Sequence, residues 1–177
     1  KLFEFKPVYI YGYSSSLFSI SSLIAEKGLK VPKLKKIITN AEPLYSYQKK
    51  QIEKVFQTEC IETYGMAETV AAASMCEYNS MHAWPETGLW EILDLENNKL
   101  KIGQAGRLIS TGFINKTMPL IRYDTGDVIS MLKNKQCKCG RTLPIIKKIL
   151  GRDDDLIITP DGNRVGRLDP IFKNNFN

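Results

Sequence analysis

The chain has 177 residues, 43% of them apolar, and a formal net charge of +6. This length and apolar content allow a buried core and indicate a globular class, and no apolar run approaches the ~20 residues that a membrane span needs. The lysines are scattered among acids, so no basic stripe for nucleic acid is expected. The Ser-rich start lacks the order of a signal peptide, and we expect a cytoplasmic protein.

The first strand and helix are predicted near the start of the chain. The sequence does not begin with Met and opens inside a strand-like run at 6–11, so we expect a piece of a longer protein. Ser14 or Ser15 would cap the helix that follows, and Gly28 would end it in a left-handed conformation. The apolar face of this helix consists of Leu17, Ile20 and Ile24.

A β/α rhythm continues to about residue 84. The run at 33–39 predicts a second strand, and 40–44 leads into a second helix with an apolar stripe of Ile52, Val55 and Phe56. The run at 59–66 predicts a third strand, in which Cys60 is expected to be a core residue. This alternation favours an α/β fold with a parallel sheet.

After about Pro85 the pattern changes to short strands joined by turns, which predicts a small antiparallel or barrel-like subdomain. The predicted strands are 88–95, 100–103, 106–111 and 127–132. A last hairpin is predicted at 156–165, with Pro160 and Gly162 as its turn residues.

The only histidine accompanies three of the four cysteines. Cys76 and His82 are separated by five residues, and Cys137 and Cys139 by one. Three thiolates and one imidazole close a tetrahedral zinc shell, which would make the site structural. The alternative is a set of ordinary buried cysteines beside a surface histidine. The Lys-rich loop around Cys137 favours zinc, because thiols have little packing role there.

The segment "TYGMAET" lies at the end of the third predicted strand. Tyr64 could stack on a base, Gly65 follows it, and Glu68 could hold a metal, because ligands gather at the carboxyl ends of parallel strands. An ordinary strand-to-helix turn explains the same residues.

The stretch "LIRYDTGDVI" places polar residues between two apolar runs. Tyr123, Asp124, Thr125, Gly126 and Asp127 supply more chemistry than chain reversal requires. The alternative is a loop in which Asp and Thr only satisfy backbone groups.

The stretch "GRDDD" at 151–155 places three acids directly after Arg152. It indicates either a solvated interdomain loop or a hinge in which the Arg152 guanidinium donates to a ligand hydroxyl.

Four segments in this order resemble the core motifs of the adenylate-forming enzymes, the superfamily of acyl-CoA ligases. They are "AEPL" (41–44), "YGMAE" (64–68), "RYDTGD" (122–127) and "GRDDD" (151–155). The Cys/His pair and the run from "MPLIRYDTGD" to "CKCGRTLPIIKKILGRDDD" are similar to the phenylacetate-CoA ligase branch and the CapK-type capsular polysaccharide biosynthesis proteins. The resemblance covers nearly the whole chain.

This resemblance implies a domain organisation. Residues 1–151 would be the C-terminal part of the large adenylating domain, with a β/α portion at 1–84 and a β-rich subdomain at 85–151. Residues 152–177 would hold the hinge and the start of the small C-terminal domain. The implied reaction is ATP-dependent activation of a carboxylic acid as acyl-AMP, which then passes to a thiol such as coenzyme A.

The resemblance also implies roles for single residues. Asp127 would accept hydrogen bonds from the ribose hydroxyls, because an ionised carboxylate only accepts, and Arg152 would help to hold the ribose. Glu68 would bind Mg²⁺, and Asp154 would be the hinge position. The remaining nucleotide-binding residues would be Ala41, Glu42 and Pro43 along the adenine, with Tyr64 packed against it and Gly65 beside Tyr64.

Departures from the family pattern leave alternatives open. Ala67 stands where the family usually has Ser or Thr, which favours a non-catalytic nucleotide-binding relative. The phosphate-gripping loop and the distal lysine of the small domain are not in the sequence, so this fragment alone is expected to be inactive. A zinc-stapled interaction module is the third hypothesis.

Overall fold

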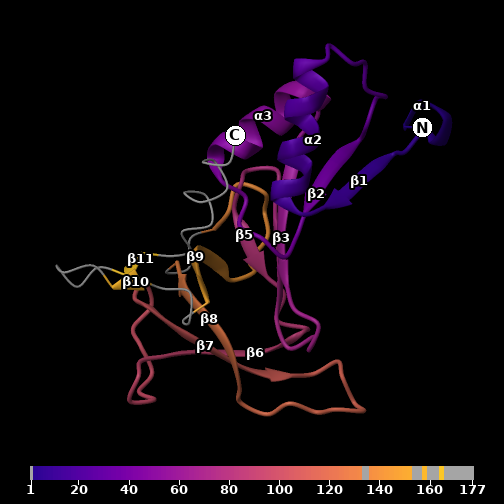
Figure 1. Cartoon of the computed structure of the whole chain (residues 1–177). Helices are drawn as coiled ribbons and strands as arrows, with labels where there is room; N and C mark the ends of the chain where they lie inside the picture. Colours follow the sequence, from indigo (N-terminus) through magenta and orange to yellow (C-terminus); the bar gives the residue numbers. More distant parts are fainter. Residues whose placement is uncertain (1, 133–135, 153–156, 159–163, 166–177) are drawn as a thin grey trace.

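One mixed sheet of nine strands organises the part of the chain that the computed structural model describes, residues 2–132, 136–152, 157–158 and 164–165 (Figure 1). The sheet has the order β1-β2-β3-β4-β5-β9-β8-β7-β6. Its strands are β1 (Tyr9–Gly12), β2 (Lys36–Thr39), β3 (Cys60–Gly65), β4 (Ala72–Met75), β5 (Met81–Ala83), β6 (Gly88–Leu93), β7 (Ala105–Gly112), β8 (Tyr123–Met131) and β9 (Ile145–Arg152). The helices are α1 (Leu2–Phe5), α2 (Ser14–Glu26) and α3 (Ser46–Phe56).

The parallel portion forms as predicted. β1, β2 and β3 pair in parallel, and Figure 1 shows α2 and α3 next to each other at this end of the sheet. Their shared core consists of Leu17, Ile24, Leu34, Ile37, Ile52, Phe56 and Cys60. Cys60 is a core residue as predicted, with 1% of its surface exposed. Ile20 was expected on the buried face of α2, but it is 46% exposed because the core touches only a narrow stripe of that helix.

The amino end of α2 is capped differently from the prediction. The N-cap residue is Tyr13, and neither Ser14 nor Ser15 occupies that position. The carboxylate of Glu42 accepts a hydrogen bond from the Ser15 backbone N–H at 2.9 Å, and the Ser14 hydroxyl donates to the Glu42 carbonyl at 3.2 Å. The helix is therefore capped from a distant segment. Gly28 follows its carboxyl end at φ +58°, as predicted.

The change to antiparallel pairing occurs earlier than residue 85. β3 already pairs antiparallel with β4, and β5 joins β9, so the sheet is continuous across both portions. The short strands β4 and β5 were not predicted, because small Ala and Ser residues give little strand signal. The strand predicted at 100–103 is wrong: the Leu100 N–H bonds the Ile92 carbonyl and the segment turns at Gly103, with φ +100°.

The last predicted hairpin is present. β10 (Ile157–Ile158) and β11 (Arg164–Val165) pair antiparallel, and the predicted turn residues Pro160 and Gly162 lie outside the described residues.

Within the described residues, every helix is too short or too polar to cross a membrane.

Replacing Glu42 with Ala should lower the free energy of unfolding by about 0.5–2 kcal/mol, because it removes the acceptor at the amino end of α2. Glu42→Gln is the matched control, since its amide oxygen can still accept the Ser15 N–H. Urea denaturation followed by circular dichroism measures both. An Ala variant as stable as the Gln variant would show that this carboxylate does not cap the helix.

Candidate functional site

Tyr64 and Asp127 meet at the carboxyl end of β3. The Tyr64 hydroxyl donates a hydrogen bond to Asp127 Oδ2 at 2.6 Å, although the two residues are 63 positions apart. On the other side of Asp127, the pairing of β8 with β9 places Arg152 directly opposite in register. Three residues singled out from separate motifs are thus brought to one place.

The polar interruption predicted at 120–129 is a bulge in a continuous strand, so the predicted start of this strand at 127 was too late. β8 runs from Tyr123, and its register against β7 shifts between Arg107 and Ile109. The buried Thr125 hydroxyl donates to the Leu108 carbonyl at 2.9 Å and accepts the Asp127 N–H at 3.1 Å. These bonds fix the bulge and aim Asp127.

Gly126 allows Arg152 to lie against the bulge. Gly126 has φ +73°, and a Cβ placed there would come within 2.9 Å of Arg152 Nη2. A glycine suits the left-handed backbone here, and it leaves room for the guanidinium of Arg152 to lie close to the bulge.

Glu68 and Tyr123 form a second contact between the same two motifs. Glu68 lies in the loop after β3, and its Oε1 accepts a hydrogen bond from the Tyr123 hydroxyl at 3.2 Å. Both side chains are half-buried. Since a carboxylate has two oxygens and about four acceptor positions, Glu68 retains capacity for a cation. One carboxylate beside phosphate oxygens and water is a usual Mg²⁺ environment, so Glu68 fits that role.

Both tyrosine hydroxyls have a pKa raised above the ordinary value. Burial, and then the neighbouring Asp127 carboxylate, raises the pKa of Tyr64. Burial and the hydrogen bond to Glu68 raise the pKa of Tyr123. Both hydroxyls therefore remain protonated at neutral pH and act as hydrogen-bond donors.

The segment predicted to lie along the adenine follows β2, at the same sheet edge as Tyr64. Ala41 and Pro43 are exposed, and Ala41 has φ +65° with its N–H bonded to Asn40 Oδ1 at 2.7 Å. The carboxylate of Glu42 accepts the Ser15 N–H at the start of α2, so part of its acceptor capacity is used within the chain. Asp154, the predicted hinge residue, lies outside the described residues.

The predicted zinc ligands converge. Cys76 follows β4, His82 lies in β5, and Cys137 and Cys139 precede β9, yet their ligand atoms all lie within 4.8 Å of one another. Cys76 Sγ is 3.7 Å from Cys137 Sγ, and Cys139 Sγ is 3.4 Å from His82 Nε2. A tetrahedral ion with Zn–S of ~2.3 Å and Zn–N of ~2.0 Å holds its ligand atoms roughly 3.5–3.8 Å apart. The donor set and the spacing fit zinc.

Two tight turns and a hydrogen bond from Ser80 favour metal binding by this cluster. Asn79 N–H bonds the Cys76 carbonyl at 2.9 Å, and Gly140 N–H bonds the Cys137 carbonyl at 3.0 Å, so each cysteine opens a tight turn. A hydrogen bond from Ser80 lowers the pKa of Cys137 to about 6, which favours the thiolate. His82 is 1% exposed, and its Nδ1 has no partner among the described residues.

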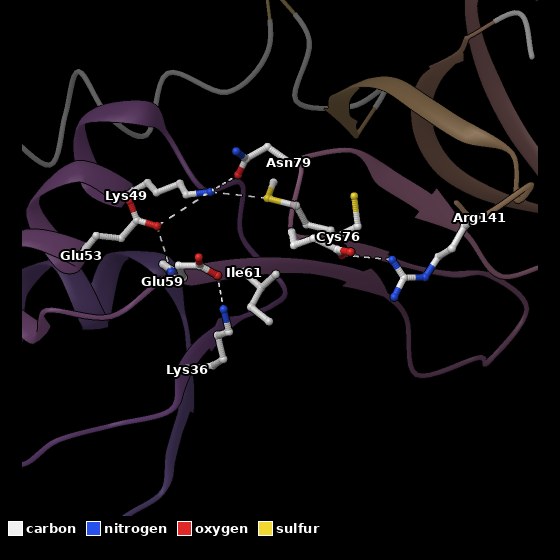
Figure 2. Close-up of a pocket in the computed structure, with 11 residues that line it drawn as sticks. Lys36, Lys49, Glu53, Glu59, Ile61, Cys76, Asn79 and Arg141 are labelled. Atoms are coloured by element: carbon white, nitrogen blue, oxygen red, sulfur yellow. Dashed lines mark hydrogen bonds and ion pairs between the residues drawn. The ribbon is translucent and has the colours of Figure 1, made fainter. Parts of the chain in front are cut away.

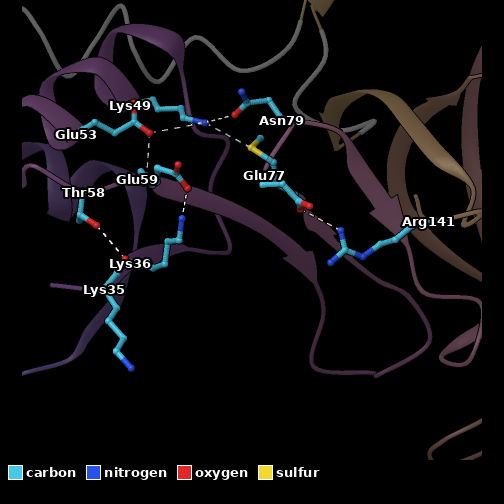
Figure 3. Close-up of polar contacts among 11 residues, drawn as sticks. Lys35, Lys36, Lys49, Glu53, Thr58, Glu59, Glu77, Asn79 and Arg141 are labelled. Carbon is cyan, nitrogen blue, oxygen red and sulfur yellow. Dashed lines mark hydrogen bonds and ion pairs between the residues drawn. The ribbon is translucent and has the colours of Figure 1, made fainter. Parts of the chain in front are cut away.

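A cavity of about 340 Å³ borders the cluster on the side of α3 (Figure 2). It lies at the amino end of β3, opposite the end that carries Tyr64, and Cys76 lines it. Its charged groups pair with one another: Lys36 with Glu59, Lys49 with Glu53, and Arg141 with Glu77 (Figure 3). Lys49 also bonds Asn79, which ties α3 to the Cys76 turn. Nothing in this lining matches the nucleotide motifs.

Sequence reasoning noted Tyr123 but assigned it no role. The available signal was a repeated spacing, because a tyrosine precedes an acid by four positions in both "YGMAE" and "YDTGD". The pairing of Arg107 with Asp124, which braces the bulge, was also missed. It joins residues 17 positions apart across a register shift that no sequence pattern shows.

Comparison with known proteins agrees with these motifs. No family model matches the chain. It is 29% identical over 162 residues to a phenylacetate-coenzyme A ligase of Thermus thermophilus, covering 88% of this chain and 36% of that protein. It is 26% identical over 158 residues to Protein CapK of Staphylococcus aureus, covering 89% and 34%. The chain thus spans about a third of the length of the curated relatives it matches.

Solved structures of 2-hydroxyisobutyryl-CoA ligase are similar as well. The structure in the postadenylation state with R3-HIB-AMP matches with a TM-score of 0.78 and 27% identity, over 93% of this chain and 36% of that chain. An open conformation of the same ligase with 2-HIB-AMP and CoA matches with a TM-score of 0.75 and 26% identity, over 93% and 40%.

The mixed sheet that carries these motifs matches part of the fold of 2-hydroxyisobutyryl-CoA ligase. The chain is thus similar in sequence to phenylacetate-coenzyme A ligase and CapK, and in fold to 2-hydroxyisobutyryl-CoA ligase, which supports a place among the adenylate-forming enzymes.

Replacing Thr125 with Val should lower the free energy of unfolding by about 1–3 kcal/mol, because the Leu108 carbonyl and the Asp127 N–H would both lose their partner. The control, Thr125→Ser, keeps the hydroxyl and removes one methyl group, which should lower the free energy of unfolding by about 1 kcal/mol. Chemical denaturation compares the two. Equal stability of the Val and Ser variants would show that the hydroxyl does not hold the bulge.

Proposed function

We propose that the protein containing this chain is an ATP-dependent ligase that activates a carboxylic acid as acyl-AMP and transfers the acyl group to a thiol such as coenzyme A. The observation that carries the proposal is the Tyr64–Asp127 hydrogen bond with Arg152 opposite, at the sheet edge where the motif resemblance expects the nucleotide. Relatives named phenylacetate-coenzyme A ligase, and a ligase whose structures contain acyl-AMP and CoA, support this reaction class.

In this proposal the nucleotide lies across the carboxyl ends of β2 and β3 and the bulge in β8. Asp127 accepts hydrogen bonds from the ribose hydroxyls. The hydrogen bond from Tyr64 to one of its oxygens orients the carboxylate for this role. Arg152 contributes positive charge on the same side. The backbone of 41–43 and the ring of Tyr64, beside Gly65, form the adenine side of the site. These assignments rest on the converging positions and on the family resemblance.

Glu68 is the proposed magnesium ligand. When bound, Mg²⁺ neutralises charge on the phosphate oxygens and lowers the barrier to displacement at the α-phosphate. The role of this chain is to hold the Glu68 carboxylate at a fixed place, through the hydrogen bond from Tyr123.

We propose that Cys76, His82, Cys137 and Cys139 bind one structural Zn²⁺. The proposal is supported by the convergence of their ligand atoms within 4.8 Å, with the Cys76–Cys137 and Cys139–His82 distances near tetrahedral values, and all four belong to turns or to a short strand. The ion would pin the turn after β4 to the loop before β9. Reduced cysteine ligands and ATP consumption both favour the cytoplasm as the location.

Residues 1–151 are proposed as the C-terminal part of the large domain and 152–177 as the hinge and the start of the small domain. Asp154 remains the proposed hinge residue. Ala67 keeps a non-catalytic nucleotide-binding relative as the second candidate, because its exposed side chain offers no hydroxyl beside Glu68.

The proposal is tested on the full-length protein. Calorimetric titration of AMP in the presence of Mg²⁺ measures nucleotide binding, and pyrophosphate release from ATP is measured with a panel of aryl and alkyl carboxylic acids. Acid-dependent release supports the ligase. Binding without release supports the non-catalytic relative, and no binding contradicts both and favours the zinc-stapled interaction module.

Asp127→Ala should weaken AMP binding by about 1.5–3 kcal/mol, because a charge-assisted hydrogen bond to the ribose is lost. Asp94→Ala is the control: this acid caps the exposed turn after β6 and is not part of the site. Titration calorimetry compares the two variants. An affinity unchanged in Asp127→Ala would refute the ribose assignment.

Cys137→Ser or Cys139→Ser should reduce zinc content below one equivalent and lower the midpoint of thermal unfolding, because binding energy at a structural site is also folding energy. Cys60→Ala, in the core cluster of α2 and α3, should retain the zinc. Metal analysis of protein purified without chelators measures this. Wild-type protein without zinc would end the proposal.

A further inference from the structure

The two motifs that meet at the nucleotide edge share one internal spacing. In "YGMAE" Tyr64 precedes Glu68 by four positions, and in "YDTGD" Tyr123 precedes Asp127 by four positions. In the structure the hydrogen bonds run from one motif to the other: the Tyr64 hydroxyl donates to Asp127 at 2.6 Å, and the Tyr123 hydroxyl donates to Glu68 at 3.2 Å. Each carboxylate is therefore held by the tyrosine of the other motif.

The rings that carry these hydroxyls are themselves fixed. Tyr64 and Tyr123 pack against one apolar cluster, whose buried members are Val70, Ala71, Leu108 and Ile129. Trp90 packs on Tyr64 edge-to-face, with ring centroids 6.2 Å apart and an interplanar angle of 78°. A packed aromatic ring has few rotamers, so the position of its hydroxyl is set before any ligand arrives.

The backbone beside the second contact adopts an uncommon conformation. Thr69, after Glu68, has φ +56°, and Arg122, before Tyr123, has φ +49°. Non-glycine residues seldom enter this region, and such residues concentrate at functional sites. Arg122 is held there by Thr111 Oγ1, which accepts its N–H at 2.9 Å, and by Glu91, which its Nε contacts at 3.0 Å.

We propose that Tyr123 is a positioning residue that orients Glu68 for its cation, and that the crossed tyrosine–carboxylate pairs hold the cation side and the ribose side of the site in one arrangement. The inference rests on the function proposed above and adds a residue to it. Tyr123 acts through Glu68, whereas Tyr64 acts through Asp127, so the two tyrosines should affect different ligands.

The experiment compares three tyrosine variants of the full-length protein: Tyr123→Phe, Tyr64→Phe and Tyr9→Phe. Tyr9 is a matched control because it is 53% exposed on β1, away from both motifs. Calorimetry measures the affinity for AMP without Mg²⁺ and the affinity for ATP over a series of Mg²⁺ concentrations, with no acid present. Thermal unfolding confirms that each variant is folded.

Tyr123→Phe should raise the Mg²⁺ concentration needed for half-maximal ATP binding about tenfold, the loss expected for one hydrogen bond to a charged group, and leave AMP affinity within about twofold. Tyr64→Phe should weaken AMP binding instead. Tyr9→Phe should match wild type. Equal Mg²⁺ dependence in Tyr123→Phe and Tyr9→Phe would overturn the inference, and so would a matching loss of AMP affinity in Tyr123→Phe.

Glu68→Gln supplies a second route, because it keeps an acceptor for Tyr123 and removes the charge. If Tyr123 acts through Glu68, the double variant Tyr123→Phe/Glu68→Gln should need no more Mg²⁺ for half-maximal ATP binding than Glu68→Gln alone. Additive losses would place Tyr123 outside this path and overturn the inference. Wild-type protein that binds no nucleotide would reject the proposed function and the inference with it, whereas normal wild-type binding with an unaffected Tyr123→Phe rejects only the inference.

Discussion

β3 is the strand on which the arrangement of the site depends. It pairs in parallel with β2 through Ile37–Cys60 and Ile38–Ile61, and antiparallel with β4 through Tyr64–Ala73. Its amino end is buried beneath α3, where Cys60 is 1% exposed. Its carboxyl end therefore lies at the boundary between the parallel and antiparallel portions, where Tyr64 can reach Asp127 of β8 across the sheet.

The predictable part of the fold is the part with strong periodicity. Helices α2 and α3 and the strands between them follow apolar stripes that end at turn residues, and these were found within a few positions. β4, β5 and the bulge in β8 were not predicted. A strand of three or four residues rich in Ala, Ser and Met has no clear period, and the position of a bulge depends on the partner strand. The capping of α2 by Glu42 was missed since it joins residues 27 positions apart.

The candidate site shows the same division. The four metal-ligand candidates could be named from residue type and spacing, against the alternative of buried cysteines beside a surface histidine, and the structure brings them together. The candidate nucleotide-binding residues could be named only from the order of the motifs. The hydrogen bonds between them could not be predicted from the sequence. The donation from Tyr123 to Glu68 requires the bulge, the turn at Thr69 and the packed ring to coexist, and these are tertiary features.

β9 connects the two sites physically. Its amino end follows Cys137 and Cys139, and its carboxyl end carries Arg152 opposite Asp127. The pairing of β9 with β8 has register shifts at Val128/Ile129 and at Ser130/Met131, so regular hydrogen bonding alone does not fix the register of this strand. A one-residue slip would send the side chain of Arg152 to the other face of the sheet. The zinc ion proposed for the cluster would anchor the start of β9 to β4 and β5, and would thereby help to fix which residue faces Asp127 at the other end of that strand. In this proposal the placement of β9 links the zinc cluster before its amino end to Arg152 at its carboxyl end, opposite Asp127.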